Sequence, residues 1–83
     1  MEIKILEQRQ ERIFKGVSAL FKKDGEWYYA DLVNLPFYGN ECMIFTANES
    51  GKVTDWSDVY CNRQMSAVDE DNLLFCIKEF CAE

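Results

Sequence analysis

The clearest pattern along the chain is a pair of alternating apolar and polar runs on either side of Asp24-Gly25. This dipeptide favours a two-residue type I′ turn, because both central residues of that turn need a positive φ. A two-residue loop pairs Lys23 with Glu26 and thereby fixes the register of every later pair. A hairpin over residues 13–23 and 26–34 is therefore predicted. One face of it is wholly apolar (Phe21 with Tyr28, Ala19 with Ala30, Val17 with Leu32) and the other is mixed (Lys22 with Trp27, Leu20 with Tyr29, Ser18 with Asp31, Gly16 with Val33).

Three further segments have the length and composition of strands. The first covers residues 2–9, the second runs from Cys42 to Ala47, and the third returns over residues 53–56. Apolar runs of this length bounded by turn residues are typical of strands in a sheet.

Turn residues separate these segments. Pro36 cannot donate to a sheet, and Gly39-Asn40 is expected to form the turn that follows it. Residues 48–52 read as a hairpin loop with Gly51 in the left-handed conformation. Residues 57–64 show no clear periodicity, so Val59 and Tyr60 either extend a strand or enter the core from a loop.

The last element is predicted to be an amphipathic helix over residues 70–81. Asp69 is a favourable N-cap, and Val68 and Leu73 occupy the positions of a hydrophobic staple around it. Apolar residues then recur at intervals of three and four, which places them on one face. They are Leu73, Cys76, Ile77, Phe80 and Cys81.

These elements predict a single α+β domain over residues 1–83. Its antiparallel sheet has four to five strands in a meander of hairpins, packed against one C-terminal helix. The second face of the sheet is expected to be solvated or covered by a partner, because one helix covers one face. The expected core is Val17, Ala19, Phe21, Tyr28, Ala30, Leu32, Ile44, Leu73, Ile77 and Phe80, with Phe45 there or on the reverse face.

The charge is uneven along the chain. Residues 1–40 hold six acids and six bases, whereas residues 41–83 hold nine acids and three bases, so the second half carries the whole net charge of −6. A direct nucleic-acid binder needs a basic footprint, and an anionic membrane surface attracts basic segments. The charge therefore argues against both kinds of partner.

Catalytic and metal-binding chemistry find little support in the residue types. The chain has no histidine, no phosphate-binding glycine motif and no nucleophile elbow, so we expect no enzymatic activity and no cofactor. Cys42, Cys61, Cys76 and Cys81 lack the paired spacing of a zinc site and are expected to be reduced structural thiols. The start of the sequence has no apolar signal region, and we expect a cytoplasmic protein.

Two surfaces are candidates for contact with a partner. The first is acidic: Asp55 and Asp58 flank Trp56, and Glu70 and Asp71 follow at the helix start. Carboxylates beside an aromatic anchor suit a basic protein surface, including one that natively holds nucleic acid. Solvation and helix capping are the alternative role for these acids.

The second candidate is an aromatic patch. It comprises Trp27 and Tyr29 on the mixed hairpin face and Tyr38 beside the following turn. Such residues favour either ordinary packing or a homodimer through the open sheet face.

The leading hypothesis is a small, non-enzymatic protein-binding module. It resembles, in general character only, the inhibitor and accessory proteins of phages and mobile elements. In that case it is expected to block an enzyme that handles nucleic acid. The alternative hypothesis is a structural homodimer.

Overall fold

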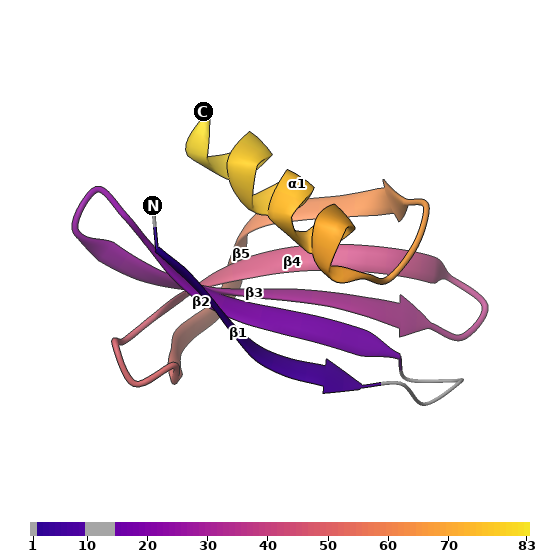
Figure 1. Cartoon of the computed structure of the whole chain (residues 1–83), viewed down its shortest axis with the longest axis horizontal. Helices are drawn as coiled ribbons and strands as arrows, with labels where there is room; N and C mark the ends of the chain where they lie inside the picture. Colours follow the sequence, from indigo (N-terminus) through magenta and orange to yellow (C-terminus); the bar gives the residue numbers. More distant parts are fainter. Residues whose placement is uncertain (1, 10–14) are drawn as a thin grey trace.

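The computed structural model of the protein describes residues 2–9 and 15–83 (Figure 1). The described chain forms five strands followed by one helix. Their bounds are β1 Ile3–Arg9, β2 Gly16–Lys23, β3 Glu26–Leu35, β4 Gly39–Ala47, β5 Val53–Met65 and α1 Glu70–Cys81. The predicted beginning of the first hairpin, at residues 13–14, lies outside the described residues.

The five strands form one antiparallel sheet in the order β1-β2-β3-β4-β5. Helix α1 lies across one face of this sheet, which we call the helix face (Figure 1). The predicted α+β architecture is therefore confirmed, with five strands in a meander. The β3–β4 turn and the β5–α1 connection lie at one end of the sheet, and the β2–β3 and β4–β5 loops lie at the other (Figure 1).

The β2–β3 hairpin has the predicted turn and register. Asp24 and Gly25 have φ values of 51° and 84°, as a type I′ turn requires. Lys23 pairs with Glu26, and every cross-strand pair back to Gly16 and Val33 follows the predicted order. A tight turn therefore set the register of the two central strands.

The core lies between the helix face and α1. All ten predicted core residues belong to it, with Tyr28 only partly buried. Aromatic rings meet at its centre, where Phe80 of α1 packs edge-on against Tyr28 at 5.0 Å and Phe21 at 6.0 Å between ring centroids. Further buried residues outside those ten complete it: Cys42, Tyr60, Met65, Val68 and Cys76.

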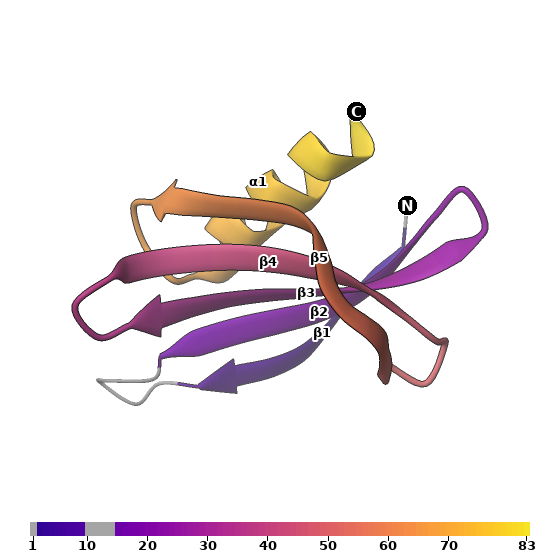
Figure 2. The same cartoon turned by 180° about the vertical axis from the view of Figure 1, so that it is seen from behind.

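The opposite side of the sheet, the reverse face, is partly covered by the chain itself. Leu20 is 5% exposed and Phe45 is 6% exposed, although both side chains point away from α1. A Cβ on Gly51 would stand 3.6 Å from Leu6 and 3.9 Å from Leu20, so the β4–β5 loop lies against this face. Figure 2 shows β5 bending across the other strands to bring the loop there. The expectation that only solvent or a partner covers this face was therefore wrong at this end.

The β3–β4 turn is placed differently from the prediction. Gly39 and Asn40 were expected to form it, but they already belong to β4 and pair with Leu35 and Asn34. The turn instead centres on Pro36 and Phe37, and the N–H of Tyr38 closes it by donating to the carbonyl of Leu35 at 3.1 Å. The turn therefore has Phe37 in a conformation that usually requires glycine or asparagine, with φ 71°.

Candidate functional site

A four-residue bulge in β5 carries the first three candidate residues. Ile44 of β4 pairs with Tyr60, and Thr46 pairs with Asp55. Phe45 alone therefore stands opposite the four residues from Trp56 to Val59. Extra residues in one strand of a pair bend it and increase its twist. The bulge is where β5 leaves the line of β4 (Figure 2).

Two contacts hold the bulge in place. The carboxylate of Asp55 accepts a hydrogen bond from the backbone N–H of Ser57 at 2.9 Å, which closes an Asx turn. The ring of Trp56 packs edge-on against Phe45, with 5.2 Å between ring centroids. Phe45 is itself buried on the reverse face, so Trp56 rests on the folded body of the protein.

The bulge nevertheless presents Trp56 to solvent. Its side chain is 72% exposed, and Asp55 and Asp58 on either side are exposed as well. Val59, at the end of the bulge, adds a second exposed apolar side chain. A large aromatic ring between two carboxylates, on a locally braced backbone, has the composition of an interface anchor.

Glu70 and Asp71 lie elsewhere on the molecule. Glu70 accepts a hydrogen bond from Gln8 of β1 at 3.2 Å, at the end of the sheet that holds the β3–β4 turn. Asp55 pairs with Thr46 beside the β4–β5 loop, at the opposite end and on the opposite edge strand. The structure thus divides the five acidic-surface candidates into two separate groups.

The helix start also has a structural use for its acids. The carboxylate of Asp69 accepts hydrogen bonds from the backbone N–H and the side-chain amide of Asn72, both at 2.8 Å. The backbone hydrogen bond from Asn72, followed by the side-chain one, lowers the pKa of Asp69. Asp69 is therefore the N-cap that the sequence predicted, with Glu70 and Asp71 in the first turn.

The aromatic candidates are also divided. Trp27 and Tyr29 lie on the reverse face and are half-buried, with the ammonium of Lys22 5.6 Å from the Trp27 ring. Tyr38 is in the β3–β4 turn and is 84% exposed. Tyr38 therefore does not share a patch with the other two.

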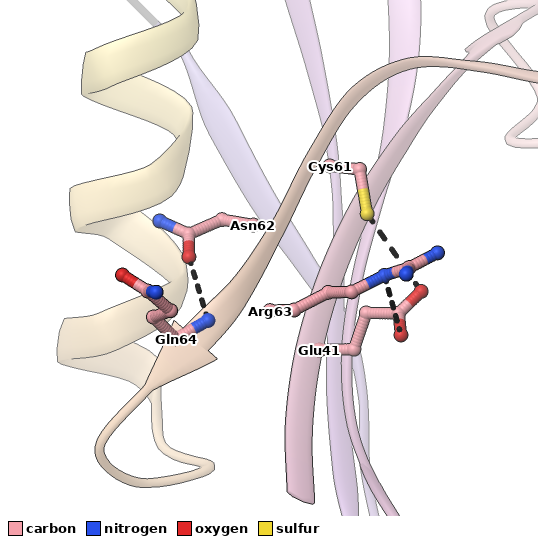
Figure 3. Close-up of polar contacts among 5 residues, drawn as sticks. All are labelled: Glu41, Cys61, Asn62, Arg63 and Gln64. Carbon is pink, nitrogen blue, oxygen red and sulfur yellow. Dashed lines mark hydrogen bonds and ion pairs between the residues drawn. The ribbon is translucent and has the colours of Figure 1, made fainter. Parts of the chain in front are cut away.

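The four cysteines are thiols in different surroundings. Cys42 and Cys76 are buried in the core, where their mutual hydrogen bond raises the pKa of Cys42 and lowers that of Cys76. Cys61 is exposed on β5, where its thiol lies 3.7 Å from the carboxylate of Glu41 (Figure 3). The same carboxylate forms an ion pair with Arg63, with 3.5 Å between Nε and Oε2.

Neither a cluster of metal ligands nor a membrane-spanning helix occurs among the described residues. Within residues 2–9 and 15–83, no group of three or more cysteine and carboxylate side chains is placed to hold a metal ion. No helix in this part of the chain is long and apolar enough to cross a bilayer.

One exposed side chain on α1 did not stand out in the sequence. Phe75 is 55% exposed on the outer side of the helix. Its position two residues after Leu73 and two before Ile77 turns it away from the core. Helical spacing is therefore the one feature of the sequence from which its exposure could have been predicted.

No protein-family model, curated protein or solved structure matches the chain.

Proposed function

We propose that this protein is a non-enzymatic binding module that docks on a protein partner through the β5 bulge. The observation that supports the proposal is the exposure of Trp56 between Asp55 and Asp58, on a bulge braced by Phe45. Exposed tryptophan is a frequent source of binding energy at interfaces, and a braced side chain loses little entropy on binding.

The charge indicates what kind of surface the partner offers. With a net charge of −6, the protein associates fastest with a basic surface. A groove that natively holds nucleic acid is such a surface, since lysine and arginine line it. The module would then act as an inhibitor or accessory protein, in which Asp55 and Asp58 occupy positions of phosphate groups and Trp56 supplies the apolar contact.

The acids of the bulge and the acids of the helix start have different roles in this proposal. Screening at physiological salt limits exposed charges to a range of about 8 Å. Glu70 and Asp71 are on the other edge of the sheet from the bulge, so they add general attraction rather than contacts beside Trp56. Asp55 and Asp58 are the docking charges.

The test begins with isolation of the partner on immobilised protein, followed by its purification and measurement of affinity. Trp56→Ala is expected to weaken binding about 30-fold, as loss of a hot spot of about 2 kcal/mol would. The double variant Asp55→Lys/Asp58→Lys is expected to slow association and reduce its dependence on salt. Nucleic acid added in excess is expected to compete with the protein.

A matched control variant makes the same change in net charge at two acids outside the bulge. Glu49→Lys/Glu83→Lys reverses two exposed acids outside the bulge and is expected to bind nearly as the unmodified protein does. If both bulge variants bind with unchanged affinity and rate, the β5 bulge is not the docking surface.

A homodimer is the alternative function, and the open part of the reverse face favours it. Tyr29, Val33 and Met43 lie on that face and are only half-buried. Light scattering at micromolar concentration separates the two functions. A dimer that dissociates in Tyr29→Asp supports the alternative, and a monomer rejects it.

A further inference from the structure

The tip of the β3–β4 hairpin presents two adjacent aromatic side chains to solvent. Phe37 is 104% exposed and Tyr38 is 84% exposed, so neither ring packs on the rest of the protein. Large apolar side chains that protrude in this way gain nothing for the fold. The tip lies at the end of the sheet remote from the β5 bulge (Figure 1).

The backbone of the tip is strained at the same residue. Phe37 has a φ of 71°, which costs little for glycine but brings the Cβ of any bulkier residue against its own carbonyl. The turn closed between Leu35 and Tyr38 needs that positive φ at its third residue. A glycine at position 37 would fit the turn better, so the benzyl side chain is kept at a cost in stability.

The stem below the tip holds its shape. The side chain of Asn34 donates a hydrogen bond to Asn40 across the hairpin at 2.9 Å, and Asn40 donates to the carbonyl of Met65 in β5 at 3.2 Å. The ring of Pro36 fixes its own φ at the value that the second position of the turn needs. The backbone of the tip is therefore held in one conformation before any partner arrives, which lowers the backbone entropy lost on binding.

We propose that the tip formed by Phe37 and Tyr38 is an anchor that inserts into an apolar pocket of a protein partner, with basic side chains at the pocket rim. The two rings can bury roughly 300–500 Å². This is short of the ~800 Å² that each side of a stable interface buries, so neighbouring surface must also take part. At this end of the molecule that surface includes three exposed acids at the helix start, Asp69, Glu70 and Asp71, with one lysine, Lys15, near Asp69, so its balance is acidic.

The same charge argues against two other occupants. A second copy of this chain carries the same net charge of −6, so it would offer the tip no charge complementarity. An anionic membrane would be repelled in the same way. A basic protein pocket satisfies both the aromatic tip and the acids at the same end of the molecule.

Photo-crosslinking can identify the occupant directly. p-Benzoylphenylalanine replaces Tyr38 in one variant and, as a matched control, exposed Phe75 in another, and both are irradiated in the cells that natively produce the protein. The expected result is one protein joined to position 38 and not to position 75. Products joined to lipid, to a second copy of this chain, or equally to both positions would overturn the proposal.

The captured protein is then purified and titrated with three forms of the full chain. Phe37→Gly is expected to weaken binding at least tenfold while raising the melting temperature, because it removes the anchor and relieves the strain. Phe75→Ala is expected to bind as the unmodified protein does. Unchanged affinity of Phe37→Gly, or a melting temperature that falls, would overturn the proposal.

This inference does not depend on the β5 bulge, and the two can fail separately. Trp56→Ala tests the bulge and leaves the tip intact, whereas Phe37→Gly tests the tip and leaves the bulge intact. Loss of binding in both variants identifies a partner that contacts both ends of the sheet.

Discussion

At Cys61, two neighbours of opposite charge act on an exposed thiol. Partial loss of water around the sulfur has the largest effect and raises the pKa of Cys61, and the carboxylate of Glu41 raises that pKa further. The guanidinium of Arg63 acts in the other direction and lowers the pKa. The balance is a raised pKa, so less of the thiol is present as reactive thiolate at neutral pH than in an isolated cysteine.

We predict that Glu41→Gln accelerates alkylation of Cys61 at neutral pH and that Arg63→Gln slows it. The first change removes a charge that raises the pKa, so half-maximal reactivity moves to lower pH; the second moves it to higher pH. Iodoacetamide labelling followed by peptide mass spectrometry over a series of pH values measures both shifts. Cys42 is buried and serves as an internal control that stays unlabelled in the folded protein. Equal alkylation rates in the two variants would contradict the opposite effects of Glu41 and Arg63 on the pKa of Cys61.

At the scale of single elements, β5 shows how an edge strand is kept from pairing with other chains. The side chain of Asn62 accepts the backbone N–H of Gln64 at 2.9 Å (Figure 3), and Asp55 accepts that of Ser57 in the same way. Each bond occupies a backbone donor of this edge strand. An edge strand with unpaired donors is a template for aggregation, and these side chains remove two of them.

We predict that Asn62→Ala increases self-association, because it returns the N–H of Gln64 to the open edge. Light scattering during incubation at high protein concentration measures the effect. Gln64→Ala is the control, since it leaves the capped N–H in place. The prediction is wrong if the two variants associate at the same rate.

The two hairpins differ in how far the sequence could predict them. The two-residue turn at Asp24-Gly25 leaves one register for β2 and β3, and alternation then follows residue by residue. By contrast, β5 uses thirteen residues beside the nine of β4. Each extra residue reverses which side of the strand the following side chains face, so the alternation that marks a strand is lost over residues 57–64. Tyr60 is buried and Val59 is exposed for this reason.

The bulge also explains what the sequence showed of the candidate site. Trp56 was named as an apolar anchor because Asp55 and Asp58 flank it, and the structure places all three residues on the surface. The grouping of these residues with Glu70 and Asp71 followed from sequence distance. The meander puts β5 on one edge and brings the helix start near β1 on the other, and no local pattern contains that information.

At the scale of the whole molecule, stability depends on the contact between one helix and one sheet face. A domain of this size has a free energy of unfolding of about 5–15 kcal/mol. Leu73 is fully buried where α1 meets the sheet, whereas its neighbour Leu74 is only half-buried.

We predict that Leu73→Ala lowers the free energy of unfolding by about 2–5 kcal/mol, the range for a buried leucine that leaves a cavity. Leu74→Ala, the same change one residue later, is expected to cost less because water already reaches that side chain. Urea denaturation followed by tryptophan fluorescence measures both. Similar losses in the two variants would show that α1 does not pack as described.

The helix has a further consequence for how the protein is made, since α1 follows all five strands along the chain. The sheet is therefore synthesised before the side chains that cover its helix face, among them Leu73, Ile77 and Phe80. A nascent chain that has emerged only as far as residue 69 can pair its strands but exposes their apolar face, which is the state that chaperones bind and that aggregates. Burial of the core therefore has to wait until α1 has been synthesised, and a chain interrupted before α1 would leave the helix face of the sheet uncovered.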